Sequence, residues 1–321
     1  MDLADLNPSA LMRQTLLGMS RNDQLRSAIE AAPVSREVVR RFVGGVTDED
    51  VVAVATELVD TRRLVTIDYL GEDTVDPVMA ERTRDAYVTL LGVLSEAGLT
   101  ADGTVEVSLK LSALGQALGR DGNAIALENA RMICQAAANA GTTVTLDAED
   151  HTTTDLTLSV LHDLRQDWPW VGAVLQSYLY RTEQDCRDLA TEGSRVRLCK
   201  GTYKEPESVA FQDKPDVDRS FVRCLKILME GPGYPMVASH DPRLVEIATV
   251  LADKAQREPD SYEFQMLLGI RPEEQLRLAA TGARMRVYVP YGEQWYGYLM
   301  RRMAERPANL GFFLRGLATR G

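Results

Sequence analysis

Eight strand-like segments, most of them followed by a helix-like segment, constrain the fold of this 321-residue chain more than any other feature. Helical patterns such as residues 126–141 and 271–282 fill the gaps, and both end at a glycine. This order predicts parallel strands joined by right-handed crossovers, and eight units close a (β/α)8 barrel of the TIM type. An open doubly wound sheet is the alternative. The predicted strands are residues 63–70, 104–111, 142–149, 171–179, 195–201, 235–240, 262–268 and 284–290.

The segment before the first predicted strand reads as helical and carries no chemistry of its own. Ser35 and Thr47 are the expected helix caps, and an acidic first turn follows Thr47. We therefore expect two regions, an N-terminal helical arm over residues 1–60 and a barrel domain over residues 61–321. Chains of this length could form two domains, but barrels of this size commonly fold as one.

Charge and cysteine usage exclude several classes of protein. The net charge of −11 and the pI near 4.9 argue against nucleic acid as a partner, because phosphate binding needs a basic surface. The four cysteines lack metal-ligand spacing, and no HExxH motif occurs, so a zinc site is not expected. No signal peptide and no apolar run of about 18 residues is found, which predicts a cytoplasmic protein.

Polar residues alternate with apolar ones in the predicted strands. In residues 104–111, for example, Glu106 and Ser108 share one face while Val105 and Val107 share the other. Solvent-exposed edge strands would also show this pattern, but if all the alternating strands were edge strands, too little of the sheet would be buried. We therefore expect four polar side chains to converge at the barrel mouth, where active sites on this fold lie: Lys110, Asp147, Arg197 and Tyr288.

Taken singly, these residues leave several chemistries open. Lys110 could form a Schiff base, grip a substrate or make a structural ion pair, and Asp147 could be a base, a metal ligand or the partner of Lys110. The turn at residues 200–202 could cradle a phosphate or simply end a strand. His240 is as compatible with a structural role as with a functional one. Rossmann, P-loop and serine-hydrolase motifs are absent from the sequence.

Near the C-terminus, two adjacent arginines follow a run of aromatic residues. On a helix starting near residue 293, Tyr298, Arg301, Arg302 and Glu305 share one face. Two fixed guanidinium groups beside aromatic rings suit the binding of a small carboxylate. A solvated face of arginine and glutamate is the alternative.

Six segments in order resemble proline dehydrogenase, in particular its shorter, monofunctional bacterial type. They are DYLGE (68–72), LKLSALG (109–115), TLDAED (145–150), RLCKGTY (197–203), ASHD (238–241) and the run from 286 to 310. The resemblance spans roughly residues 60–315. It implies a distorted (β/α)8 barrel whose last helix lies over the barrel mouth. The implied activity is oxidation of L-proline to Δ1-pyrroline-5-carboxylate, with hydride transfer to FAD and electrons passed to a membrane quinone.

The resemblance also implies a role for each matching residue. Asp147 and Arg197 match the catalytic residues. Glu305 matches a glutamate that braces the two arginines, and Glu72 matches one that can close over the site by pairing with the first of them. The implied substrate contacts are Lys110, Tyr288, Tyr298, Arg301 and Arg302. The implied FAD contacts are Ala148, Gln176, Arg197, Lys200, Gly201, Thr202, Ser239 and His240.

The chain departs from the family pattern at three positions. Thr202 replaces a usual alanine, while Ser239 and Asp241 replace a usual threonine and asparagine, so Asp241 adds negative charge near the expected cofactor phosphates. Functional coupling to a pyrroline-5-carboxylate dehydrogenase and peripheral contact with the inner face of the cell membrane are further implications. A barrel lyase that uses a Schiff-base lysine and a catalytically silent amino-acid-binding barrel are the rival hypotheses.

Overall fold

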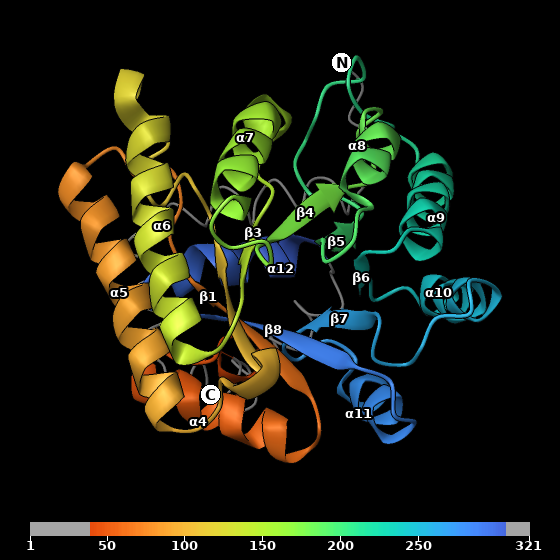
Figure 1. Ribbon diagram of the computed structural model, residues 1–321, viewed down its shortest axis with the longest axis horizontal. Helices are drawn as coiled ribbons and strands as arrows, with labels where there is room; N and C mark the ends of the chain where they lie inside the picture. The colour runs from red at the N-terminus through yellow and green to blue at the C-terminus, as the bar shows by residue number, and fades with distance from the viewer. Residues whose placement is uncertain (1–38, 306–321) are drawn as a thin grey trace, which may run out of the picture.

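The computed structural model describes residues 39–305, with side chains described for residues 39–300. Eight parallel strands form a closed barrel in chain order (Figure 1). Closure comes from β1 and β8, which pair from Leu64 with Arg286 to Tyr69 with Tyr291. The predicted barrel is thus confirmed and the open sheet is wrong. The strands are β1 Leu64–Tyr69, β2 Val105–Leu109, β3 Val144–Leu146, β4 Gly172–Gln176, β5 Arg195–Cys199, β6 Tyr234–Ala238, β7 Glu263–Leu267 and β8 Met285–Tyr291.

Helices surround this barrel, and their ends follow local sequence signals (Figure 1). Asp76 and Asp241 each accept a hydrogen bond from a backbone amide in the first turn of the helix that follows. α6 ends at Gly141, whose φ of 73° is left-handed, as the sequence predicts. The helices are α4 Asp48–Asp60, α5 Pro77–Glu96, α6 Gly122–Ala140, α7 Thr154–Arg165, α8 Thr182–Leu189, α9 Lys214–Glu230, α10 Pro242–Lys254, α11 Pro272–Ala280 and α12 Trp295–Glu305.

Part of the predicted N-terminal arm falls within the described residues. Thr47 caps α4 in a capping box with Asp50, as the sequence predicts. Val51, Ala55 and Leu58 on this helix are buried in the main hydrophobic core. Residues 1–38, including the expected cap Ser35, lie outside the described residues, so the boundary at residue 60 stays a prediction.

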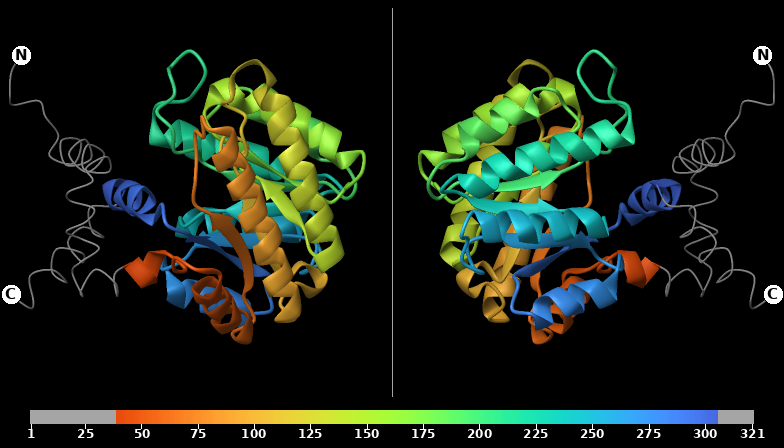
Figure 2. Two further views of the ribbon diagram at one scale, coloured as in Figure 1. Left: turned by 90° about the vertical axis from the view of Figure 1, so that its left-hand side faces the viewer. Right: turned by 90° about the vertical axis from the view of Figure 1, so that its right-hand side faces the viewer.

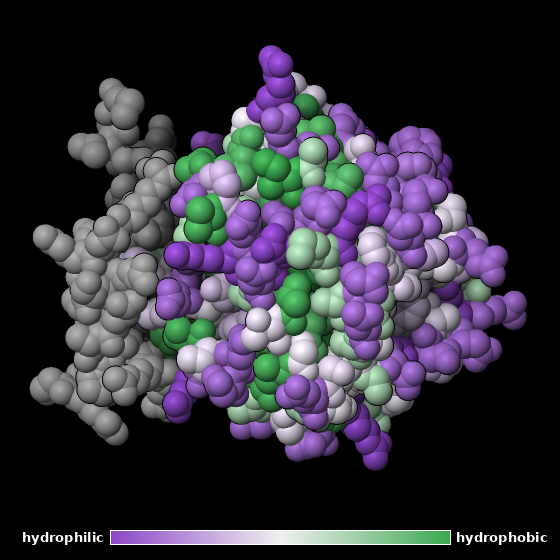
Figure 3. Space-filling view, turned by 60° about the vertical axis from the view of Figure 1, so that its left-hand side comes forward, coloured by the Kyte–Doolittle hydropathy of each residue, from purple (hydrophilic) through white to green (hydrophobic). Residues whose placement is uncertain are grey.

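Both faces of the barrel strands are buried. All five residues of β2 are inaccessible to solvent, and its apolar members Val105, Val107 and Leu109 belong to the main core. Glu106 and Ser108 alternate with them and make polar contacts with residues of neighbouring strands. Solvent-exposed edge strands are therefore excluded as the cause of the polar alternation. The outer surface is mostly hydrophilic on the face in Figure 3, with hydrophobic residues in scattered groups.

α12 follows β8 and packs against the barrel beside the ends of the strands (Figure 2). It begins at Trp295, two residues after the predicted start, and its apolar residues up to Met300 are buried. They form a second hydrophobic cluster with residues from the strand ends and the segment before α4: Phe42, Val43, Leu70, Ile270, Trp295, Tyr296, Tyr298, Leu299 and Met300. Within residues 39–305, no helix is long and apolar enough to cross a membrane.

Candidate active site

A cavity of about 2000 Å³ opens at the carboxyl ends of the strands. Such a volume exceeds the roughly 300–1,000 Å³ of common ligand pockets, so a dinucleotide and a small substrate could share it. Tyr296 and Tyr298 of α12 form part of its wall, which confirms that the last helix lies over the barrel mouth. The expected site residues that line the cavity are Glu72, Lys110, Asp147, Ala148, Gln176, Arg197, Lys200, Gly201, Thr202, Ser239, His240, Tyr288 and Tyr298.

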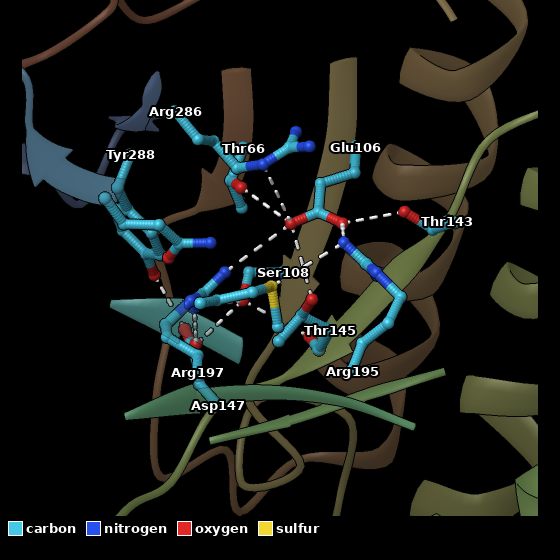
Figure 4. A network of polar contacts seen from close by, with 12 residues as sticks. Thr66, Glu106, Ser108, Thr143, Thr145, Asp147, Arg195, Arg197, Arg286 and Tyr288 are labelled. Carbon is cyan, nitrogen blue, oxygen red and sulfur yellow. Dashed lines mark hydrogen bonds and ion pairs between the residues drawn. The ribbon is translucent and has the colours of Figure 1, made fainter. Parts of the chain in front are cut away.

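Asp147 is the centre of the polar contacts at the barrel mouth (Figure 4). Its Oδ1 accepts hydrogen bonds from Arg197 Nη1 at 2.7 Å and from Ser108 Oγ at 2.7 Å. Its Oδ2 accepts one from Tyr288 Oη at 2.7 Å and lies 3.9 Å from Lys110 Nζ. The predicted convergence of Lys110, Asp147, Arg197 and Tyr288 is therefore confirmed.

The closest partner of Lys110 differs from the expected one. Lys110 Nζ donates to both oxygens of Asp68, at 2.8 and 2.7 Å, and is 3.9 Å from Asp147. Asp68 stands in the same DYLGE segment as Glu72, but it was not among the predicted site residues. Strand alternation could have found it, since Asp68 lies two residues after Thr66 on β1. Burial opposes the charge of Lys110, but Asp68 and Asp147 outweigh that effect and raise its pKa.

Arg197 is almost fully buried, with 4% of its surface exposed, and stacks 5.3 Å from the ring centroid of Tyr288. Its Nη1 donates hydrogen bonds to Asp147 and Ser108, whereas its Nε and Nη2 are buried without a hydrogen-bond partner among the described residues. Buried donors in this state are rare because they lose their hydration without replacement. Nη2 instead lies 3.7 Å from Glu106 Oε1, and Arg197 as a whole lines the cavity as a buried positive charge.

The turns that follow β5 and β6 also line the cavity. Lys200 Nζ contacts Asp218 at 2.5 Å and Asp241 at 3.4 Å, and Asp241 also pairs with Arg243 at 3.0 Å. The hydrogen bonds from Arg243 outweigh burial and hold the pKa of Asp241 well below its ordinary value. The charge that Asp241 adds is therefore compensated by neighbouring cations and by its helix cap.

Three expected cofactor contacts also fix the backbone around the cavity. His240 Nε2 accepts from the amide of Leu267 at 2.9 Å, which ties the end of β6 to β7. Ser239 Oγ accepts from the amide of Asp241, and Gln176 Nε2 donates to the carbonyl of Glu149 at 2.7 Å. These side chains hold their turns in place while still lining the cavity.

A carboxylate that the sequence left unassigned connects β3 to the loop after β1. Glu149 accepts from the amide of Ser112 at 3.0 Å and from its hydroxyl at 2.5 Å. Ser112 in turn accepts from the amides of Asp73 and Thr74, next to Glu72. Burial outweighs these hydrogen bonds and raises the pKa of Glu149.

The residues present suit a flavin dinucleotide. The cavity is large enough, Arg197 lines it as a buried cation, and Lys200 and Arg243 place cations beside the turns after β5 and β6. A buried cation such as Arg197 fits the electron-accepting ring of a flavin, and the cations beside the two turns fit its phosphates. The backbone at residues 301–305 belongs to α12, but the side chains of Arg301, Arg302 and Glu305 lie outside the described ones.

Comparisons with known proteins point to one family. The family model described as proline dehydrogenase matches residues 51–315. Proline dehydrogenase 1 of Bacillus subtilis (strain 168) is 38% identical over 307 residues, which cover 96% of this chain and 99% of that protein. Proline dehydrogenase of Deinococcus radiodurans is 38% identical over 284 residues, covering 87% of this chain and 90% of the relative.

Among solved structures, proline utilization A (PutA) from Bdellovibrio bacteriovorus, inactivated by N-propargylglycine, has a TM-score of 0.81 at 24% identity. The match covers 98% of this chain but only 38% of that longer one, so it supports the fold alone. The family model and the two bacterial relatives decide the family, because each matches most of the chain. This chain belongs to the proline dehydrogenase family.

Proposed function

We propose that this protein is an FAD-dependent dehydrogenase that oxidises L-proline to Δ1-pyrroline-5-carboxylate by hydride transfer. The observation that carries the proposal is Arg197, a buried cation at the barrel mouth that is aligned by Asp147 and lines the cavity beside the ring of Tyr288. Its charge would stabilise negative charge that develops on a neighbouring ring. Membership of the proline dehydrogenase family supports the choice of substrate.

The residues that would hold FAD lie along the cavity. We assign to it Ala148, Gln176, Arg197, Lys200, Gly201, Thr202, Ser239 and His240. When bound, FAD would supply the acceptor for the hydride and pass the electrons on to a membrane quinone. Gly201 matters to this turn because its φ of 103° and the nearby ring of Tyr178 leave no room for a Cβ atom.

The substrate would bind between these residues and α12. Arg301 and Arg302 would hold the proline carboxylate, and Glu72 and Glu305 would act as their counter-charges. Tyr288 and Tyr298 would enclose the apolar ring, and both line the cavity. Fixing the carboxylate and the ring together would bring the carbon next to nitrogen into a reactive geometry.

The remaining residues would orient the substrate and exclude water from the site. Lys110 is held by Asp68 and Asp147, so it would act as a fixed positive charge beside the substrate. Proline must lose its amine proton before its lone pair can assist hydride loss, and we assign no single residue as the base. α12, which buries Leu299 and Met300, would shield the site from water. Functional coupling to a pyrroline-5-carboxylate dehydrogenase would consume the product.

A Schiff-base lyase is less well supported. A lysine must be uncharged to attack a carbonyl, but Asp68 and Asp147 raise the pKa of Lys110 despite burial. The other candidate, Lys200, is paired with Asp218 at 2.5 Å. Both lysines are therefore engaged as cations.

Spectroscopy of the purified protein separates these activities. We expect a yellow protein whose flavin absorbance is bleached by L-proline without oxygen. A protein that stays colourless after reconstitution with FAD would contradict the proposal. Borohydride trapping of a substrate adduct on Lys110 or Lys200 would instead support the lyase.

A further inference from the structure

Beneath the mouth, the barrel interior contains a second group of charged residues (Figure 4). Glu106 on β2 is fully buried, and its Oε2 contacts Arg195 Nη2 at 2.6 Å. Its Oε1 lies 3.8 Å from Arg286 Nε and accepts a hydrogen bond from Thr66 at 2.8 Å. The interior of such barrels is usually filled by branched apolar residues, so this charged group needs an explanation.

Arg197 connects this lower group to the mouth. Its Nη1 bonds Asp147 at 2.7 Å, while its Nη2 lies 3.7 Å from Glu106 Oε1. The guanidinium is thus held between one carboxylate above and one below. Glu263, the other buried glutamate of the lower group, contacts Arg286 at 2.7 Å, whereas the carboxylates that pair with Arg197 in the described part of the chain are Glu106 and Asp147.

The charges of the two groups balance. The cations are Lys110, Arg195, Arg197 and Arg286, and the carboxylates are Asp68, Glu106, Asp147 and Glu263, four of each. Burial alone would raise the pKa of Glu106, but Arg195, Arg286 and Arg197 outweigh it and hold that pKa well below its ordinary value. Glu106 is therefore an anion at neutral pH, directly beneath the cation of the site.

We infer that Glu106 is a positioning residue that tunes the reduction potential of the bound flavin by attenuating and aligning the charge of Arg197. This inference rests on the proposed function, because it assumes a flavin next to Arg197. A carboxylate within 4 Å of a buried guanidinium lowers the positive potential that the guanidinium exerts on its other neighbours. Removing that carboxylate should favour the reduced, more negative cofactor.

The test compares Glu106→Gln with Glu263→Gln in the FAD-loaded protein. Both variants remove one buried glutamate charge from the lower group, but only Glu106 contacts Arg197. For Glu106→Gln we expect the equilibrium to shift about tenfold toward reduced flavin, a potential about 30 mV more positive for a two-electron couple. Glu263→Gln should shift the same equilibrium by less than about threefold, or about 15 mV.

Thermal unfolding is recorded alongside, because both variants leave an arginine with fewer partners. If Glu106→Gln does not fold, Glu106→Gln/Arg195→Gln removes the 2.6 Å ion pair as a unit and keeps the charges balanced. It should also move the potential in the positive direction.

The outcomes distinguish this inference from the proposed function. A larger shift for Glu106→Gln than for Glu263→Gln supports it. Equal shifts, or an unchanged potential, in a yellow protein that proline reduces would overturn the role of Glu106 but not the proposed function. A wild type that binds no flavin would overturn both.

Discussion

Asp147 uses both carboxylate oxygens to organise side chains from three other strands. Arg197 of β5, Ser108 of β2 and Tyr288 of β8 each donate a hydrogen bond of 2.7 Å to Asp147. Arg197 also donates to Ser108 at 3.1 Å. Burial strengthens these contacts because little water competes for them. A single carboxylate thereby fixes both the cation and one aromatic wall of the candidate site.

The proposed carboxylate clamp predicts the behaviour of Arg302→Met. Loss of a charge-assisted contact of about 1.5–3 kcal/mol should raise the KM for proline by about tenfold to a hundredfold. FAD should remain bound, because the clamp is assigned to the substrate. Steady-state kinetics with the flavin content of each preparation checks this.

Arg219→Met is the matched control, since Arg219 is an exposed arginine on the outer helix α9, with 65% of its side chain exposed. Its KM should match that of the wild type. An Arg302→Met protein with an unaltered KM would show that the proline carboxylate binds elsewhere.

Alternation in the sequence predicted which side chains would meet at the mouth, but not how they would pair. The spacing of Lys110 and Asp147 put both at strand ends, yet Asp68 is the closer partner of Lys110. Pairing depends on barrel register, such as Asp68 opposite Ser108, and register is set by closure of all eight strands. The spacing of residues along the chain therefore could not predict which carboxylate would pair with Lys110.

Strands were predicted correctly in number and order, but several end earlier than expected. β3 covers Val144–Leu146, whereas residues 142–149 were predicted. Asp147 and Glu149 turn their side chains to the cavity wall, and Asp150 caps the short helix that follows. Polar residues at the end of a strand therefore marked the site and not a continuation of the sheet.

The turn after β5 predicts a strong effect of Gly201→Ala. A Cβ at Gly201 would lie 2.3 Å from atoms of the Tyr178 ring, and the φ of 103° is unfavourable for alanine. Strain and overpacking should together lower the free energy of unfolding by about 2–4 kcal/mol. Urea unfolding of the variant and the wild type measures this loss.

Gly193→Ala is the control, because Gly193 also has a positive φ, of 73°, but nothing lies within 4 Å of its Cβ position. Its cost should be only about 1 kcal/mol, from the backbone alone. Equal losses in the two variants would mean that contact with Tyr178 does not constrain the turn.

The barrel as a unit should lose stability steeply in acid. Arginines outweigh burial and hold the pKa values of Glu106 and Glu263 below their ordinary value of 4.5. Below about pH 4.5 the unfolded chain binds protons that the folded barrel does not, so the free energy of unfolding falls as the pH falls. Thermal unfolding between pH 3 and pH 7 should show Tm dropping below about pH 4.5, and a flat Tm there would contradict the buried network.

Protonation of Glu149 should change the stability in the opposite direction. Burial raises its pKa, so the stability linked to its protonation is present below pH 4.5 and is lost as the pH rises through the raised value. Glu149→Gln mimics the protonated form. Its Tm relative to the wild type should therefore be higher at pH 7 than at pH 4.5, and the reverse order would contradict this assignment.

Anaerobic rapid mixing with L-proline tests most directly whether proline is oxidised at the cluster around Asp147. Asp147→Asn keeps the shape of the side chain but removes the charge that aligns Arg197 and faces Lys110. We predict that proline bleaches the flavin of the wild type in a single turnover and reduces that of Asp147→Asn about 10²–10³-fold more slowly, with FAD still bound. Reduction of the variant at the wild-type rate would contradict the claim that the cluster around Asp147 is where proline is oxidised.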